Sequence, residues 1–470
     1  MTLNNSSWTT SNYFDEEDHR LIDNSLTSLS LNKGTVNLEK TTNFQTLTIF
    51  SNLSGSGTFN LNTNIAENKS DKIVVKGTAE GNHKIGVTNQ GANVANGKVT
   101  LVETNGGNAA FSLTNPNNRV DLGAYQYFLT KEGNNWVLAN SKNAVTPAPV
   151  TPSNPVVTPS KPVVTPNKPV VTPTAPVLPS TPLLSDLANA QVSLRQAQLL
   201  LVEDGLTGIH QRLGEVKNGE KGNVWVRNVN SRQKLAALSA GESETSGFKQ
   251  NIHSLQVGAD AAVTDNLRVG GFVGRSQANV DFNGNYGDGK VRSNSVGLYA
   301  AYLADNGIYV DNIVKYSRLH ANSDHTEKRH YNAYTISSEL GKRFSLANDW
   351  TITPQAQLAW THISSQENED SLSSVYSRIG LRVAKGFALS NGWNLQPYAE
   401  VNAITSKNRS SKIHYTNSAL DVASSRGRFE SAVGLNAGFA NHRFGLEVSR
   451  ADGKNFDKPY AIQAVYRYQW

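Results

Sequence analysis

The residue types that most often carry catalysis or metal binding are scattered through this 470-residue chain. Its ten histidines form no HExxH motif and no other metal-ligand spacing. No GxSxG, GxGxxG or Walker A motif follows a predicted strand. The acidic run 15–18 could attract a cation, but one run supplies too few positioned ligands, so a solvated surface turn explains it better. We therefore expect no catalytic residue, no cofactor and no metal site, and no enzyme activity.

Net charge, cysteine content and hydropathy limit the other classes of function. A net charge of +6 is weak for this length and comes with no basic cluster in the sequence, so nucleic acid is not an expected partner. The absence of cysteine excludes disulfide scaffolds and thiolate sites, and it suits a chain that crosses the periplasm unfolded. No run of 18 apolar residues exists, which excludes a transmembrane helix. A transmembrane barrel stays open, because its half-polar strands fit the mean hydropathy of -0.43.

Polar and apolar residues alternate with period 2 throughout 222–470. In 350–363 most even positions are apolar, and in 393–406 most odd positions are apolar. An even number of such strands, most of them as long as a bilayer crossing requires, is typical of an outer-membrane barrel. The predicted strands are 223–235, 248–263, 267–281, 290–303, 308–321, 329–345, 350–363, 374–389, 393–406, 426–440, 443–450 and 459–470.

The connections between these strands alternate in length. Tight turns such as 264–266 and 390–392 alternate with longer polar loops such as 236–247 and 407–425. This alternation is the outer-membrane pattern of periplasmic turns and extracellular loops, and it argues against a soluble sandwich. Aromatic residues near strand ends fit an interfacial belt: Tyr302, Trp350, Trp360, Trp393, Tyr460 and Tyr468. The last strand ends in Tyr466, Tyr468 and Trp470 on one face, an ending similar to the signal that barrel-assembly machinery reads.

The polar face of these strands should line a lumen. It carries Gln355, Gln357, Gln396, Glu400, Asn402, Gln463 and Arg467. A helix is predicted over 183–216, with a break near Gly205 and Gly208. If this helix threads the pore, Arg195 and Arg212 are expected to pair with lumen acids such as Glu339 and Glu400. A plain porin also has a polar lumen, so the polar face by itself does not distinguish a plugged pore from an open one.

Two further zones precede the helix. Residues 1–142 contain short apolar runs separated by turn residues, which fit either the end of a β-solenoid or a β-sandwich. Residues 143–182 hold a seven-residue Pro-Val-Val-Thr-Pro repeat, which predicts an extended polyproline-like spacer. The predicted organisation is therefore 1–142, a spacer at 143–182, a linker helix at 183–217 and a barrel at 222–470.

Six short sequence motifs, spread over these zones, together resemble one protein family. In the first zone they are 53–61, 70–75 and 120–127; in the linker helix, Arg-Leu-Gly-Glu within 211–216; in the barrel, 339–344 and 396–398. In this order the phrases resemble the autotransporters of type V secretion, and most closely the pertactin group. The resemblance implies an all-β chain: the β-helical end of a passenger, a Pro-rich linker, a pore helix and a 12-stranded antiparallel transmembrane barrel.

The resemblance also implies a function and a location. The barrel would insert in the bacterial outer membrane and display its passenger on the cell surface, where the passenger would serve adhesion or resistance to host defence, a virulence role. Implied partners are outer-membrane lipid, barrel-assembly machinery, periplasmic chaperones, and host surface or matrix proteins. The polar stretch 1–6 predicts no signal peptide in this sequence. The alternative is a porin-like channel with a periplasmic N-terminal domain.

Overall fold

The fold is taken from a computed structural model, which describes residues 1–470 except 93, 95, 141–181, 216, 241–242 and 416–417. The chain forms two compact units. The first comprises Met1–Ser185, and the second comprises Asp186–Tyr415 and Ala419–Trp470.

The first unit is a β-solenoid of about four turns. One sheet stacks β1 (Thr2–Asn4), β6 (Leu29–Leu38), β8 (Leu53–Asn64), β11 (Asn82–Asn89) and β13 (Ala110–Leu113). The facing sheet contains β7 (Thr46–Ile49), β10 (Lys72–Val75) and β12 (Lys98–Thr104). Neighbouring strands in both stacks run parallel. The sandwich alternative is therefore wrong, because sandwich sheets pair antiparallel strands.

Two glycines let successive turns of the solenoid stack closely. Gly55 and Gly81 have φ of 87° and 93°, in the left-handed region that side chains disfavour. A Cβ atom at Gly81 would lie 1.8 Å from the carbonyl oxygen of Gly55 in the turn below. Between the sheets, the His83 ring packs in the core against Phe59 and Phe111 in tilted arrangements, at centroid distances of 5.8 and 5.2 Å. The interior is therefore a ladder of buried apolar side chains with one histidine inside it.

The parallel stack ends in an antiparallel meander of β14 (Arg119–Leu122), β15 (Tyr125–Glu132) and β16 (Asn135–Ala139). The chain leaves this cap after β16 and returns to it at Leu183. The backbone N–H of Gln126 donates to the Leu183 carbonyl at 3.0 Å, and the N–H of Ser185 donates to the Ala124 carbonyl at 2.9 Å. Apart from Pro182, the predicted spacer 143–182 lies outside the described residues.

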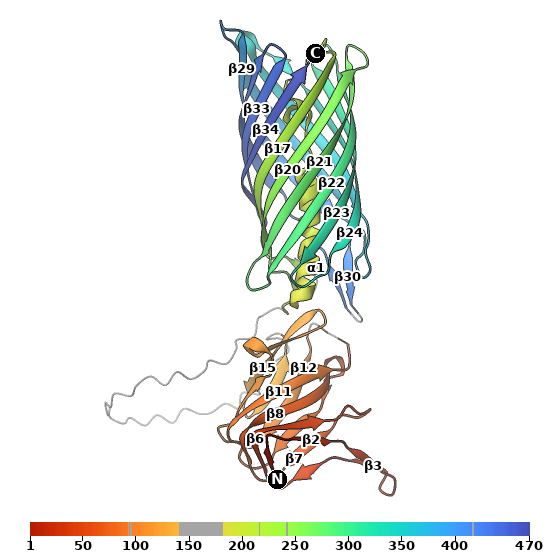
Figure 1. The fold of residues 1–470 in the computed structure, drawn as a ribbon, viewed down its shortest axis with the longest axis vertical. Coiled ribbons are helices and arrows are strands. Elements are labelled where there is room, and N and C mark those ends of the chain that lie inside the picture. Colours follow the sequence, from red (N-terminus) through yellow and green to blue (C-terminus); the bar gives the residue numbers. More distant parts are fainter. Residues whose placement is uncertain (93, 95, 141–181, 216, 241–242, 416–417) are drawn as a thin grey trace, which may run out of the picture. The chain divides into compact units, whose positions relative to one another are not determined.

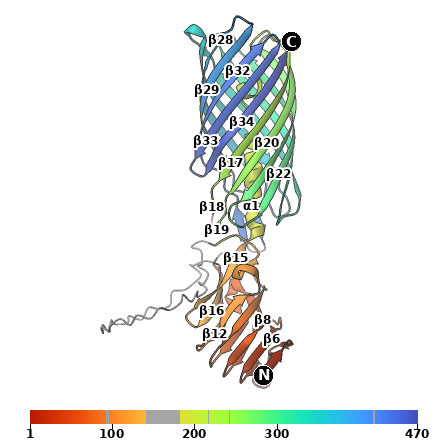
Figure 2. The ribbon, with the colours of Figure 1, turned by 60° about the vertical axis from the view of Figure 1, so that its left-hand side comes forward.

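The second unit is a closed antiparallel barrel of twelve long strands in the described residues (Figures 1 and 2). The strands are β17 (Gly222–Leu235), β20 (Phe248–Ala262), β21 (Leu267–Phe282), β22 (Asp288–Leu303), β23 (Ile308–Ser323), β24 (Arg329–Lys342), β26 (Trp350–Ile363), β27 (Leu372–Lys385), β29 (Trp393–Asn408), β32 (Arg428–Phe439), β33 (His442–Gly453) and β34 (Phe456–Gln469). The first strand β17 pairs with the last strand β34, which closes the sheet. The predicted strands match these within a few residues, and 350–363 matches at both ends.

The connections follow the predicted alternation with one exception. Turns such as 304–307 lie at one rim, and loops such as 236–247 and 409–427 lie at the other. However, β33 and β34 are joined at the long-loop rim by 454–455 alone, because both strands extend further than the sequence pattern indicates. Between β29 and β32, strands β30 (Lys412–Tyr415) and β31 (Ser418–Asp421) form a two-stranded sheet that the sequence pattern does not predict.

The side chains of the barrel are arranged with polar groups inside and apolar groups outside. Lumen residues such as Gln355, Glu400 and Arg467 are at most 4% exposed, whereas outward Leu358 and Val401 are 58% and 50% exposed. Water-soluble domains bury their apolar face, so an apolar outer face on a closed barrel indicates that lipid surrounds it.

A helix lies in the lumen, visible between the strands in both views (Figures 1 and 2). It comprises α1 (Asp186–Asp204) and, after a break at 205–208, α2 (Ile209–Leu213). All α1 side chains from Ala188 to Glu203 are buried, although many of them are polar. No helix among the described residues is long and apolar enough to cross a membrane.

Candidate functional site: the polar lumen and its helix

The lumen helix is held to the barrel by polar contacts along its whole length. Near its start, the side-chain amide of Asn189 donates to Ser246 Oγ at 3.0 Å and its oxygen accepts from the Ser246 N–H at 2.9 Å. After the helix, the Asn218 amide donates to Asp305 Oδ1 at 3.1 Å. Ser246 lies near the end of the long loop 236–247, and Asp305 lies in the short turn 304–307. The chain therefore runs through the lumen from the long-loop rim to the short-turn rim.

Arg195 anchors the first helix near the long-loop rim. Its guanidinium is 1% exposed, and Nη2 donates to the Asp370 carbonyl at 2.8 Å. Arg195 Nε lies 3.7 Å from Glu369 Oε2, and the guanidinium covers the ring of Tyr331 at 4.9 Å. An arginine suits this position because its planar group can stack on a ring and donate sideways at the same time.

Arg212 anchors the second helix. Its Nη2 donates to Asp311 Oδ1 at 2.7 Å, and both side chains are 1% exposed. The same guanidinium lies 4.2 Å from the ring centroid of Tyr299. A charge removed from water this completely needs a partner, and Asp311 on β23 supplies it.

The predicted partners of the two arginines are therefore wrong. Arg195 pairs with Glu369 and Arg212 with Asp311, while Glu339 and Glu400 are neutralised by barrel arginines. Arg378 Nη2 lies 2.8 Å from Glu339, and Arg378 Nη1 lies 3.1 Å from Glu400. The physical reason is register: Arg378 reaches both acids from within the barrel wall, which leaves the helix to find other carboxylates.

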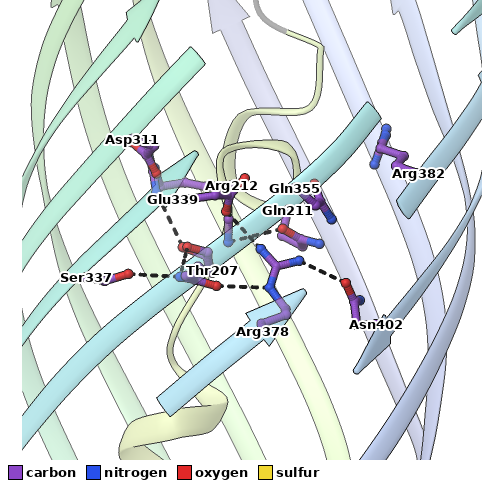
Figure 3. A network of polar contacts seen from close by, with 12 residues as sticks. Thr207, Gln211, Arg212, Asp311, Ser337, Glu339, Gln355, Arg378, Arg382 and Asn402 are labelled. Carbon is purple, nitrogen blue, oxygen red and sulfur yellow. Dashed lines mark hydrogen bonds and ion pairs between the residues drawn. The ribbon is translucent and has the colours of Figure 1, made fainter. Parts of the chain in front are cut away.

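Glu339 and Glu400 nevertheless contribute to the site, because both accept hydrogen bonds from Arg378. Arg378 is the centre of the polar network drawn in Figure 3. Gln211 of α2 donates to Glu400 Oε1 at 3.1 Å. Arg378 Nε donates to Gln357 Oε1 at 3.0 Å, and Gln357 Nε2 donates to the backbone carbonyl of Thr207 at 3.2 Å. The Arg378 network of the barrel wall thus holds the chain around the helix break through hydrogen bonds to Gln211 and Thr207.

The helix break has no space for a side chain at Gly208. A Cβ atom there would lie 2.1 Å from Glu339 Oε2 and 2.8 Å from Arg378 Nη2. The φ of Gly208 is -81°, which any residue can adopt, so the requirement is one of space. The glycine lets the backbone approach the buried ion pair closely.

Below α2, Glu215 and Arg467 hold the chain as it approaches the first strand. Arg467 Nη2 donates to the Glu215 carbonyl at 2.8 Å and Nη1 to Glu220 at 2.8 Å. Arg343 Nη1 lies 3.0 Å from the Glu215 carboxylate. Beside these residues a cavity of about 460 Å³ opens towards the short-turn rim, so the plug is tight in the middle and looser at this end.

The last strand forms the seam of the barrel. Tyr468 and Trp470 are 36% and 53% exposed on the outer face, and the Tyr466 hydroxyl bonds with His442 Nδ1 at 2.8 Å. The Trp470 carbonyl accepts the N–H of Lys221 at 3.0 Å, which ties the end of the chain to the first strand. A role of these three aromatics in barrel assembly stays a prediction.

Sequence reasoning missed several residues of the lumen: Asp311, Tyr299, Tyr309, Arg378 and Arg382. The period-2 pattern carried the signal for some of them. Arg378 and Arg382 are four apart in one strand and so share the lumen face. Which acid each arginine meets depends on the register of neighbouring strands, which the sequence does not show.

The arrangement fills the lumen around α1 and α2 with paired polar side chains. Among the described residues, no group of three or more His, Asp, Glu or Cys side chains could hold a metal ion. The buried charges of the helix pair with opposite charges of the barrel, which holds the helix in place.

A closed barrel with an apolar outside, a helix in its lumen and a β-solenoid before it together define an outer-membrane barrel with an extracytoplasmic β-helix. Residues 224–449 match the model of the autotransporter beta-domain family, and residues 26–140 match the pertactin family. The chain belongs to the autotransporters, in the pertactin-like group, and its barrel resides in the bacterial outer membrane.

Relatives match over almost the whole chain. It is 32% identical to the pertactin autotransporter of Bordetella bronchiseptica over 450 residues, which are 89% of this chain and 48% of the relative. It is 30% identical to the probable autotransporter YcgV of Escherichia coli K12, over 100% of this chain and 50% of the relative. The solved beta domain of the Bordetella autotransporter BrkA covers 53% of this chain and 100% of its own, at 25% identity and a TM-score of 0.46. The chain thus spans about half the length of the first two relatives.

Proposed function

We propose that the barrel carries its own N-terminal region outwards and displays the solenoid on the cell surface, with α1 and α2 left in the lumen as a plug. The observation that carries the proposal is the direction of the chain: it enters the lumen at the long-loop rim and leaves it at the short-turn rim. Long loops face the cell exterior in outer-membrane barrels. Everything before Asp186 therefore belongs on the outer side.

The displayed region acts by binding, as an adhesin or as a factor that resists host defence. Relatives named as pertactin and as the adhesin/invasin TibA support this use, the latter at 33% identity over 70% of this chain. The flat sheets of a solenoid offer binding surface without a catalytic cleft. Membrane insertion through barrel-assembly machinery, with the aid of periplasmic chaperones, completes the proposal, and Tyr466, Tyr468 and Trp470 are the proposed assembly signal.

Folding outside the cell supplies the direction of transport. Each turn of the solenoid that forms buries apolar side chains such as Leu53 and Phe59 against the turn below. A folded turn is too wide to slip back through the lumen, so folding biases motion outwards without a nucleotide.

The test is protease access. The chain carries an epitope tag before Thr2, behind a signal peptide, and is expressed in a bacterium with an outer membrane. Protease added to intact cells should remove the tag and leave a barrel-sized fragment. A tag that survives on intact cells and is lost only after the outer membrane is opened would place the solenoid in the periplasm and overturn display.

A second measurement addresses the porin-like alternative. In planar bilayers the wild-type barrel should conduct little, because α1 and α2 occupy the lumen. A variant without 186–213 should conduct steadily. Equal, large conductance of both would mean that the helix does not fill the pore in the membrane.

A further inference from the structure

Three arginines gather on the outer face of the barrel although they are far apart in the sequence. Arg275 on β21 and Arg318 on β23 lie in register on either side of Asn294 of β22. Arg292 lies two residues before Asn294 on the same strand and therefore points to the same side. All three side chains are exposed. No single stretch of sequence shows this cluster, because three strands supply it.

The cluster lies at the edge of the apolar band. Two residues closer to the short-turn rim, the outward row contains Val273 and Val296, which are 59% and 50% exposed, followed in register by Tyr316 and Tyr334. Two residues closer to the long-loop rim, the row contains Arg292 in register with His320. The arginines therefore lie where the acyl chains end and the headgroups of the outer leaflet begin.

The positive charges of the cluster have no acidic partner within the described residues. Arg292 donates to Gln277 Oε1 at 3.3 Å, a neutral acceptor, and no ion pair of the described residues involves Arg275, Arg292 or Arg318. His320 and His330, in direct register on the neighbouring strands, add donors beside Arg292. On the far strand β33, by contrast, outward Arg450 is already paired with Asp452 at 2.8 Å.

We propose that Arg275, Arg292 and Arg318 form a binding site for the phosphate groups of a phosphorylated glycolipid in the outer leaflet. Like charges on adjacent strands repel, so an anion between them stabilises the arrangement. A guanidinium group can donate two parallel hydrogen bonds to two oxygens of one phosphate. The row of valines and tyrosines on the short-turn side of the arginines would contact the acyl chains of the same lipid. The proposal rests on the location of the barrel in the outer membrane and is independent of display.

The test compares diphosphoryl lipid A with dephosphorylated lipid A, each added to the purified full chain in neutral detergent at low salt. The variant Arg275→Gln, Arg292→Gln, Arg318→Gln should bind diphosphoryl lipid A on the order of 100-fold more weakly than wild type, since each charge near a lipid surface contributes several-fold. Arg450→Gln is the matched control, because its charge is outward but already neutralised, and it should bind as wild type does. Unchanged heat-dependent gel mobility shows that each variant remains a folded barrel.

Two results would overturn the proposal. Equal binding of phosphorylated and dephosphorylated lipid A to wild type would mean that phosphate is not recognised. Full competition by millimolar inorganic phosphate would mean a free-anion site instead of a lipid site. Loss of binding in the triple variant alone, with lipid A as the preferred ligand, is the expected outcome.

Discussion

Arg212 on the second lumen helix and Asp311 on strand β23 form an ion pair of 2.7 Å in which both side chains are 1% exposed. The pair joins the N-terminal side of the chain to the barrel wall at the point where the helix ends. It is accompanied by the Tyr299 ring, which the guanidinium covers at 4.2 Å. This contact is one of the main attachments of the helix to the barrel wall.

Removing one member of this pair should destabilise the folded barrel far more than removing both. Arg212→Met leaves Asp311 buried without a counter-charge, which costs about 3–5 kcal/mol. Arg212→Met with Asp311→Leu removes both charges and should recover most of the loss. The measurement is the temperature at which the compact gel mobility of the barrel is lost. If the single and the double variant melt alike, the pair does not hold the helix.

The second prediction concerns the space at the helix break. Gly208→Val places side-chain atoms on the buried pair of Glu339 and Arg378, so α2 must move or the pair must separate. Gly205→Ala is the control, because its Cβ would meet the flexible end of Lys315 at 3.0 Å and the Val202 carbonyl oxygen at 3.3 Å, with no atom closer. Hydrogen exchange of the amides in 209–213 should rise strongly in Gly208→Val and little in Gly205→Ala. Similar protection in both variants would contradict close packing of the helix break against Glu339 and Arg378.

The third prediction uses the return of the chain to the solenoid cap. Tyr125 and Leu184 form a bridge flanked by the hydrogen bonds of Gln126 and Ser185, which makes them a closely spaced, non-hydrogen-bonded pair. The chain has no cysteine, so Tyr125→Cys with Leu184→Cys should form one disulfide without competition. After protease cleavage at a site inserted between 150 and 170, the two pieces should separate on a gel only after reduction.

The control for this cross-link is Asn135→Cys with Leu184→Cys. Asn135 pairs with Glu132 at the turn of the β15–β16 hairpin, at the opposite end of β15 from Tyr125. This pair should remain reduced. A disulfide that forms equally well in both pairs, or in neither, would show that 183–185 is not docked on the cap.

The fourth prediction is a pH dependence of the solenoid. Burial lowers the pKa of His83, which lies between Phe59 and Phe111 and donates from Nε2 to the Glu80 carbonyl at 2.9 Å. Below the ordinary histidine pKa of about 6.5 the unfolded chain binds a proton that the folded solenoid excludes. Stability should therefore fall as the pH falls from 7 towards the lowered pKa, by at most about 1.4 kcal/mol per pH unit.

The check is hydrogen exchange of β8, β11 and β13 at pH 7 and pH 5, after correction for the intrinsic rate. Wild type should lose protection at pH 5, and His83→Phe should lose much less because its core carries no titratable ring. An identical pH slope in the two proteins would remove His83 as the cause.

Much of the barrel could be predicted from the sequence, because alternation with period 2 is a local property of each strand. The strand at 350–363 is an example, since its inward Gln355 and Gln357 and outward Leu358 are fixed by parity alone. The break at Gly205 was predicted on similarly local grounds, since glycine weakens a helix wherever it occurs.

Other features depend on pairing between distant segments. The choice between solenoid and sandwich needs to know whether β8 and β11 run parallel, which no local pattern contains. The partner of Arg212 depends on the rotation of α2 and on the register of β23, so Asp311 could not be chosen over Glu339. The contact of Leu183 with the cap, far along the chain, was beyond sequence reasoning for the same reason.

The most direct test of display is labelling of single cysteines on intact cells with a membrane-impermeant maleimide. The three positions are Lys84→Cys in the solenoid, Lys328→Cys in a long loop and Ala347→Cys at the short-turn rim, each of them exposed. Display predicts that Lys84→Cys and Lys328→Cys are labelled on intact cells, whereas Ala347→Cys is labelled only after the outer membrane is opened. Protection of Lys84→Cys together with Ala347→Cys, while Lys328→Cys reacts, would place the solenoid inside the cell envelope and contradict the account.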